Sequence, residues 1–188
     1  MAEAFSNKVV RAAGIVTSYS GSTVAAGSTA ITVTALTGIG VSFLVDNQHF
    51  IAGTKVVQTL PVSGGVGTVF TDRNSTNTAS ASSQTVKFLG PTTAYTSPAA
   101  TKSIIIGGTF ANNTSNSVNL TVEVYDTTVG VTSTGSAAIA SKIPVPSGSS
   151  FVISDTGKTL LEAEDELKVY CDSEGAVDVS LSILTGVN

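Results

Sequence analysis

The segment from residue 101 to 126, TKSIIIGGTFANNTSNSVNLTVEVYD, limits most narrowly what this chain can fold into. It holds a continuous apolar run, Ile104 to Ile106, then a short polar turn, then a stretch in which apolar and polar residues alternate. The alternating apolar residues are Val118, Leu120, Val122 and Val124, and the residues between them are Asn119, Thr121, Glu123 and Tyr125. A period of two is typical of a β-strand with one buried face. The segment therefore predicts two strands joined as a hairpin.

Similar patterns recur along the chain. Ile31, Val33 and Ala35 alternate with threonines, and Val177 to Ile183 alternates again near the end. Helical spacing is almost absent, and its one candidate, Leu160 to Lys168, also fits strand–turn–strand with the turn near Glu164 and Asp165. Short strands separated by turn signals predict an all-β fold of two β units, the C-terminal one a β-sandwich or jelly-roll-like domain.

The chain of 188 residues suits one large or two small domains. We expect an N-terminal arm over residues 1–18 that contains one strand from Val9 to Thr17. A small β module follows over residues 19–90, and a β-sandwich domain occupies residues 91–188, beginning at Pro91. We further expect the module to be an insertion, so that the strand of the arm belongs to the sheet of the C-terminal domain.

Low charge is the most unusual property of the composition. Only 12% of the residues are charged, compared with roughly 25% in a typical soluble protein. Residues 1–100 carry five basic and three acidic side chains, and residues 101–188 carry four basic and ten acidic ones, giving +2 and −6. No basic stripe is present, so we expect no nucleic-acid partner. A neutral, hydroxyl-rich surface is easily buried against copies of itself or a partner, which favours assembly.

The N-terminal sequence MAEAFSNKVVRAAG does not look like an export signal, because Glu3 stands where a signal peptide is positive and no apolar region follows. Ala12 to Val45 is uncharged, but Ser, Thr and Gly interrupt it throughout. A spanning helix needs about 20 mainly apolar residues. We therefore expect no membrane segment.

The usual catalytic patterns are missing from the sequence. His49 is the single histidine, and its neighbours favour packing or a turn hydrogen bond over catalysis. Cys171 is the single cysteine, in an apolar context that predicts a buried, inert thiol. Gly157-Lys158-Thr159 resembles the end of a phosphate-binding loop, but Val152 stands where that motif needs glycine, so SDTGKT is better explained as a β-turn.

An acidic group, Glu162, Glu164, Asp165 and Glu166, is the remaining candidate for a site. It lacks the oxygen spacing of a calcium loop, so a solvated turn is the preferred interpretation, one that could also meet a basic patch of a partner. Paired carboxylates for glycoside hydrolysis are a weaker alternative, because the chain has no tryptophan to stack on a sugar. We expect no enzymatic activity, no catalytic residue, no metal site and no cofactor.

Three segments resemble a family of small structural proteins of tailed bacteriophages, especially marine and freshwater phages. They are YTSPAATKSIIIGGTFANNTSNSVNLTVEVYD, SKIPVPSGSSFVI and TLLEAEDELKVYCDSEGAVDVSLSIL, which together cover about residues 94 to 186. Relatives often have glycine where Glu164 stands. The first unit resembles modules found in phage structural and fibre proteins.

The resemblance implies a virion component that is assembled in the host cytoplasm. We expect a capsid-surface decoration (cement) protein or a head–tail collar protein, whose partners are capsid or neck and tail proteins. A homo-oligomer is expected, with a trimer favoured by the three-fold positions of a capsid. The interface is expected on the neutral strands and the arm, so that deleting residues 1–18 weakens incorporation without unfolding the rest.

Two alternatives remain open. A tail or fibre adaptor would bind host glycans through the loop Asp72–Ser83 and the turn Asn112–Ser117, although the chain has few aromatic residues for stacking on sugars. A cellular β-sandwich adhesin is the second alternative, and the missing export signal argues against it.

Overall fold

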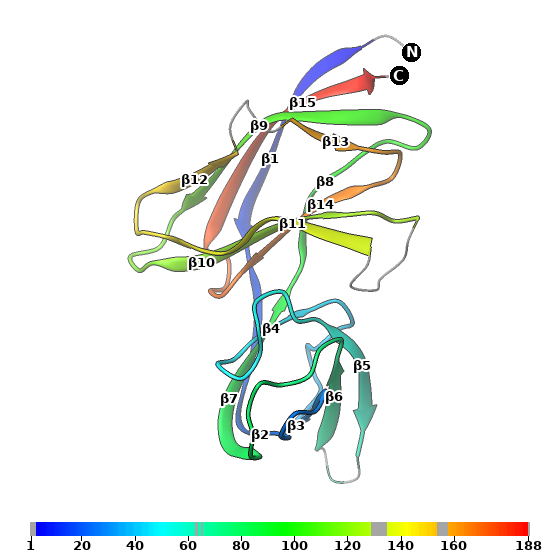
Figure 1. Cartoon of the computed structure of the whole chain (residues 1–188). Coiled ribbons are helices and arrows are strands. Elements are labelled where there is room, and N and C mark those ends of the chain that lie inside the picture. Colours follow the sequence, from blue (N-terminus) through cyan, green and yellow to red (C-terminus); the bar gives the residue numbers. More distant parts are fainter. Residues whose placement is uncertain (1–2, 63, 65, 129–134, 154–157, 188) are drawn as a thin grey trace. The chain divides into compact units, whose positions relative to one another are not determined.

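The computed structural model describes residues 3–62, 64, 66–128, 135–153 and 158–187 (Figure 1). Throughout these residues the regular structure consists of β-strands in antiparallel sheets. The all-β fold expected from the alternating patterns is confirmed. Over the same residues there is no helix long and apolar enough to cross a membrane.

The chain forms two compact units. Unit 2 comprises Val16–Pro91, and unit 1 combines the chain before and after it. The single strand predicted from Val9 to Thr17 is instead two strands, β1 (Ala4–Ala13) in a sheet of unit 1 and β2 (Ile15–Val24) in the sheet of unit 2. Residues 1–18 are therefore not a separate arm. Ala13 is completely buried in the core of unit 1. Deleting residues 1–18 would remove β1 from unit 1 and the start of β2 from unit 2, so it would damage both units, contrary to the sequence-based expectation.

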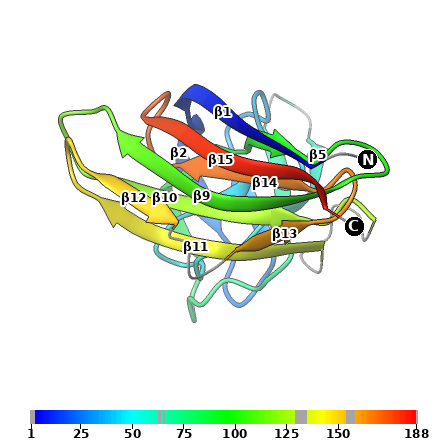
Figure 2. The same ribbon diagram turned by 90° about the horizontal axis from the view of Figure 1, so that it is seen from above.

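Unit 1 is a sandwich of two antiparallel sheets. The first sheet has the order β1, β15, β9, β12, and a further strand, β13, pairs with the other half of β9. Its strands besides β1 are β9 (Lys102–Asn112), β12 (Ser150–Ile153), β13 (Thr159–Leu161) and β15 (Val177–Val187). Figure 2 shows β1 along one edge, with β15 and β9 following it.

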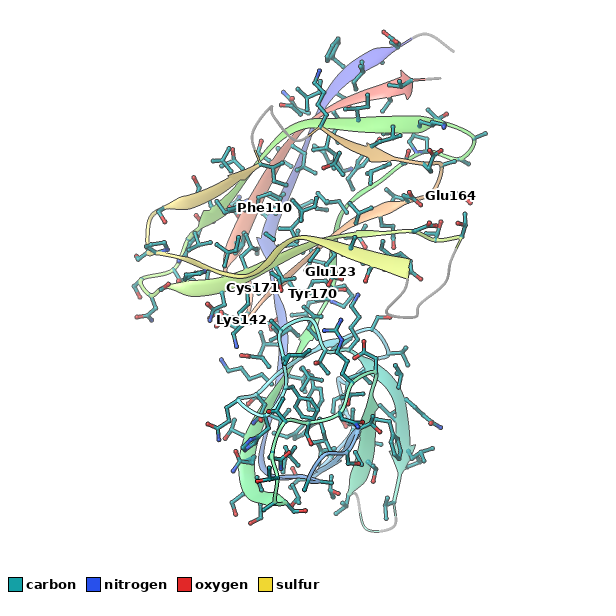
Figure 3. The ribbon with its side chains drawn as sticks, in the orientation of Figure 1. Phe110, Glu123, Lys142, Glu164, Tyr170 and Cys171 are labelled. Atoms are coloured by element: carbon teal, nitrogen blue, oxygen red, sulfur yellow. The ribbon has the colours of Figure 1, made fainter. Side chains whose placement is uncertain are left out.

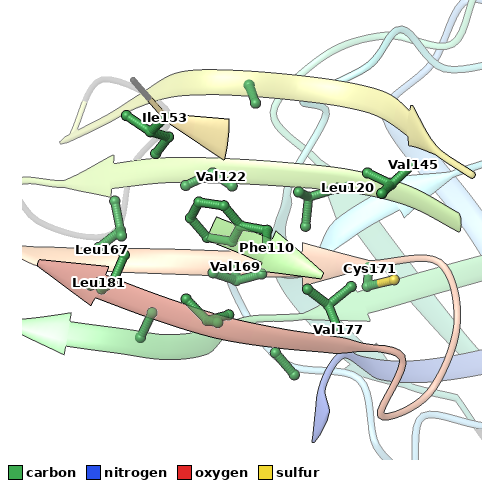
Figure 4. Close-up of a cluster of buried hydrophobic side chains, with 14 of the residues drawn as sticks. Phe110, Leu120, Val122, Val145, Ile153, Leu167, Val169, Cys171, Val177 and Leu181 are labelled. Carbon is green, nitrogen blue, oxygen red and sulfur yellow. The ribbon is translucent and has the colours of Figure 1, made fainter. Parts of the chain in front are cut away.

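The second sheet has the order β11, β10, β14, β8. Its strands are β8 (Thr92–Thr96), β10 (Val118–Tyr125), β11 (Ser136–Val145) and β14 (Glu166–Cys171). The core lies between the two sheets and contains Phe110 of β9 (Figure 4). Leu120 and Val169 from the second sheet lie in the same cluster, and all three residues are fully buried. The centroids of the Phe110 and Phe151 rings lie 5.9 Å apart.

The hairpin predicted over residues 101–126 is wrong, because its two strands lie in different sheets. β9 pairs with β15 on one side and with β12 and β13 on the other, so both of its edges are occupied. β10 pairs instead with β11 and β14. The polar turn after Asn112 therefore carries the chain from one layer of the sandwich to the other. Residues 160–168 are strand–turn–strand, and β13 and β14 are likewise split between the layers.

β10 also differs from the predicted half-buried strand, since residues on both of its faces are buried. Leu120 and Val122 face the core, while Thr121, Glu123 and Tyr125 are less than one-tenth exposed. The cross-strand partners of Thr121 and Glu123 on β14 are the long side chains of Tyr170 and Lys168. An alternating pattern identifies the strand but not what covers its polar face.

Unit 2 is a six-stranded antiparallel sheet in the order β4, β7, β2, β3, β6, β5. Besides β2, its strands are β3 (Ala30–Val33), β4 (Leu44–Asp46), β5 (Val56–Pro61), β6 (Gly67–Thr71) and β7 (Ala81–Gly90). The backbone groups of Val56 bond to Ser42 and Phe43 next to β4, so the first and last strands of the order are joined. The sheet therefore curls around its own core, in which Ile31 and Phe88 are fully buried.

Candidate interaction surface

The outer face of the first sheet of unit 1 is the face turned away from the core. On β15, Val179, Leu181 and Ile183 are buried in the core. Because side chains alternate along a strand, Ser180, Ser182 and Leu184 lie on the outer face. Register then identifies the residues of the neighbouring strands that share this face.

An apolar row crosses four strands of the outer face. Phe5 of β1 is paired with Leu184 of β15, Leu184 with Ile104 of β9, and Ile104 with Leu160 of β13. Directly opposed side chains in such pairs have Cβ atoms about 4.5–5.5 Å apart. Phe5 is 78% exposed and Leu160 49% exposed, so both ends of the row are open to solvent.

The centre of the outer face carries small, uncharged side chains. Val9 is paired with Ser180, Ser180 with Thr109, and Thr109 with Val152, which is half exposed. We call the six apolar residues on this side the outer apolar face: Phe5, Val9, Ile104, Val152, Leu160 and Leu184. The neutral strands and the N-terminal segment, where we expected an interface from the sequence, meet here.

Ion pairs border the outer apolar face at two ends. The Arg11 guanidinium lies 3.9 Å from the Asp178 carboxylate, and Lys102 Nζ lies 3.1 Å from Glu162 Oε2. Asp178 also accepts a hydrogen bond from the backbone N–H of Ala12 at 2.9 Å, where β1 departs from regular pairing. That bond, together with one from Asn113 and the charge of Arg11, holds the pKa of the Asp178 carboxyl below its usual range. Charge is thus confined to the rim.

His49 lies in a turn after β4 and takes part in turn hydrogen bonds. Its backbone N–H donates to Asn47 Oδ1 at 2.9 Å, and its carbonyl accepts from the backbone N–H of Thr76 at 2.8 Å. The ring Nε2 lies 3.3 Å from the side-chain nitrogen of Gln48. These contacts agree with the structural role expected for His49.

Cys171 is completely buried at the end of β14, as its apolar context predicted (Figure 4). Its neighbour Tyr170 belongs to a polar cluster that the sequence does not reveal, because the cluster depends on the register of β10 and β14 (Figure 3). Burial, and then the nearby Glu123 carboxylate, raise the pKa of the Tyr170 phenol above its ordinary value. Lys168 Nζ bonds to Glu166 at 2.9 Å and lies 3.6 Å from the Tyr125 ring centre. The cluster ties the two strands together.

The acidic group at 162–166 does not converge on one point. Glu162 pairs with Lys102 and Glu166 with Lys168, so two of the carboxylates have their own cations. Asp165 is buried, and its carboxylate accepts the backbone N–H of Glu162 at 3.0 Å, which closes the turn. No group of three or more His, Cys, Asp or Glu side chains that could hold a metal ion occurs among the described residues.

Glu164 occupies the turn between β13 and β14. Its φ of +68° lies in the left-handed region, which costs a non-glycine residue about 1–2 kcal/mol. We expect Glu164→Gly to raise the free energy of unfolding by about 0.5–1 kcal/mol, since the extra freedom of glycine in the unfolded chain offsets part of the gain. Chemical denaturation measures this change. Glu164→Ala removes the same carboxylate but keeps the strained φ, so an equal stabilisation by alanine would contradict this explanation.

The two loops considered for glycan binding are both held by internal hydrogen bonds. In the loop Asp72–Ser83, whose last residues belong to β7, buried Ser75 donates to the carbonyl of Ala25 at 2.6 Å. Asn77 donates to the carbonyl of Val24 at 3.2 Å. In the turn Asn112–Ser117, Asn112 is 3% exposed and bonds inward. These polar side chains therefore form hydrogen bonds within the protein that hold each loop in place.

The phosphate-loop candidate lies largely outside the described residues, since the description of the chain resumes at Lys158. Lys158 is exposed, and Thr159 begins β13. No known protein family, curated protein or solved structure matches the chain. The outer apolar face is therefore the feature of the described residues on which a function can be argued.

Proposed function

We propose that the protein is a non-enzymatic structural component of a tailed-phage virion, either a capsid-surface decoration protein or a head–tail collar protein. The resemblance of residues 94–186 to phage structural proteins supports this assignment. The observation that carries it is the outer apolar face, whose uncharged centre spans four strands and has charge only at its rim. A surface of this kind suits contact with another protein.

Repetition would make such contacts effective. A decoration protein binds many equivalent positions on a symmetric shell, and linked contacts raise the effective concentration of each further one. Modest affinity per site is then sufficient. The partners we propose are the capsid or the neck and tail proteins of the particle.

Copy number and position in purified virions test the proposal. Quantitative mass spectrometry counts the chain per particle, and cryo-electron microscopy locates it. Copies in the hundreds that follow the capsid symmetry would support a decoration protein, and a few to a few dozen at the neck would support a collar protein. A position at the tail tip or fibres would favour the glycan-binding adaptor instead. Absence from virions would overturn the assignment.

A pair of variants links occupancy to the outer apolar face. We expect Leu160→Asp to reduce the occupancy of particles by about tenfold or more, because it places an unpaired charge in an apolar contact. Val62→Asp is the matched control, since Val62 is 51% exposed in unit 2 and Leu160 is 49% exposed in unit 1. Equal occupancy of both variants would mean that another surface holds the protein in the particle.

A further inference from the structure

β1 is a long edge strand whose protection against pairing is limited to Lys8, Arg11 and a bulge after Val10. It has ten residues, and its neighbour in the sheet order is β15 alone. Natural edge strands are commonly short or protected by proline, charged side chains or bulges, because an open row of N–H and C=O groups recruits another strand. β1 contains no proline and exposes Phe5 and Val9. The edge is therefore suited to pairing with a further strand.

The residues on the outer side of β1 form a self-complementary series. Alternation places Glu3, Phe5, Asn7, Val9 and Arg11 on one side, and the register with β15 supports this, since Phe5 and Val9 share the face of Leu184 and Ser180. The series reads acidic, aromatic, amide, aliphatic, basic. An antiparallel copy with Asn7 opposite Asn7 places Phe5 opposite Val9 and Glu3 opposite Arg11.

We propose that a second copy of this chain pairs antiparallel with β1, about a two-fold axis at Asn7. The first sheets of the two copies then become one continuous sheet. Because a two-fold interface is self-complementary, the Phe5–Val9 and Glu3–Arg11 pairs each form twice. This adds a strand to an exposed edge, a mode in which main-chain hydrogen bonds supply affinity and side-chain pairs supply specificity.

Neighbouring registers are less favourable. A shift that centres the axis on Lys8 places two lysines opposite each other and Arg11 opposite Phe5. A shift that centres it on Ser6 places Glu3 opposite Val9. Only an even shift keeps the core side of both strands on one face, so these are the two nearest competitors. Like charges directly opposite destabilise the Lys8 register, and the Ser6 register loses the Glu3–Arg11 pair, so the Asn7 register is preferred.

Arg11 and Glu3 are both accessible for pairing with the second copy. The side chain of Arg11 is 86% exposed and its contact with Asp178 is long, at 3.9 Å. Glu3 is exposed as well. Exposed ion pairs add little affinity, so their main effect is to select the register. The inference does not rest on the proposed virion function, and it predicts a two-fold dimer in place of the trimer expected from the sequence.

Cysteine cross-linking tests the register directly. Opposed residues of an antiparallel pair have Cα atoms about 4.5–5.5 Å apart, which suits a disulfide. We expect Asn7→Cys to form a disulfide-linked dimer under mild oxidation. Lys8→Cys is the matched control, since its two copies would lie about 8 Å apart, beyond disulfide reach. Cys171 is buried and contributes no background. Equal cross-linking of the two variants would overturn the register.

Charge reversal with analytical ultracentrifugation tests the pairing in solution. We expect the unmodified chain to show a monomer–dimer equilibrium. Glu3→Arg and Arg11→Glu should each raise the dimer dissociation constant by about tenfold, because each creates two like-charge pairs. The double variant restores both pairs and should return to within about twofold of the original. A chain that stays monomeric or forms trimers, or a double variant no better than the single ones, would overturn the proposal.

Discussion

Gly14→Ala is expected to lower the free energy of unfolding of unit 1 by about 3–5 kcal/mol. Gly14 is buried between β1 and β2, at the position where the chain leaves the first sheet. Its φ of +128° is a conformation that side-chain-bearing residues rarely adopt. A Cβ atom at this position would also lie 2.5 Å from the carbonyl oxygen of Ser173, which belongs to the backbone and cannot rotate away.

Gly148→Ala separates the two causes. Gly148 lies in unit 1 with a φ of +67°, and a Cβ added there would meet no atom within 4 Å. This control carries backbone strain without steric overlap, and we expect it to cost about 1 kcal/mol. Denaturant titration of both variants, followed by a probe in unit 1, measures the difference. Equal destabilisation by the two substitutions would show that the contact with Ser173 adds nothing.

Asn112→Ala is expected to lower the free energy of unfolding of unit 1 by about 2–4 kcal/mol. The buried amide of Asn112 donates to the carbonyls of Asn116 and Val145, at 2.8 and 2.9 Å. Its Oδ1 accepts the backbone N–H and the hydroxyl of Thr114, both at 2.8 Å. Alanine would leave the Val145 carbonyl and the Thr114 N–H without these partners. The turn between the two layers would therefore lose the hydrogen bonds that hold it.

Two further substitutions sharpen the Asn112 experiment. Asn116 is exposed and uses backbone groups in the bonds described above, so Asn116→Ala should cost less than about 0.5 kcal/mol. Asn112→Asp keeps the acceptor for Thr114 but loses both donors and buries a charge, so it should destabilise at least as much as alanine. Thermal and chemical unfolding of the three variants supply the comparison. If Asn112→Ala unfolds like Asn116→Ala, the buried amide is not what holds the turn.

Local patterns in the sequence identified many of the elements of the fold. Alternation marked β3, β10 and β15, and it correctly placed Ile31, Leu120 and Leu181 inside. The segment around Glu164 and Asp165 was correctly expected as a turn between strands. These features follow from the period of two in a strand and from turn chemistry, which depend on neighbours along the chain.

Local sequence patterns could not predict which strands pair with one another. Residues 101–126 look like a hairpin, yet β9 and β10 belong to different layers. A continuous run such as Ile104 to Ile106 does not indicate which strand lies beside it. The bulge opposite Ser182 and the buried amide of Asn112 arise from contacts with segments far along the chain. Pairing is decided by which strand edges remain open when all layers are packed.

The features of the candidate surface also separate into those that the sequence predicted and those that only the tertiary structure shows. The sequence by itself determined an all-β chain with few charges, a buried Cys171 and no recognisable catalytic pattern. Only the tertiary structure placed Phe5 beside Leu184, Ile104 and Leu160. The physical reason is that side-chain alternation is local, whereas a face of a sheet is assembled by hydrogen-bond register between strands that are distant in sequence. The outer apolar face exists because the N-terminal and C-terminal strands pair.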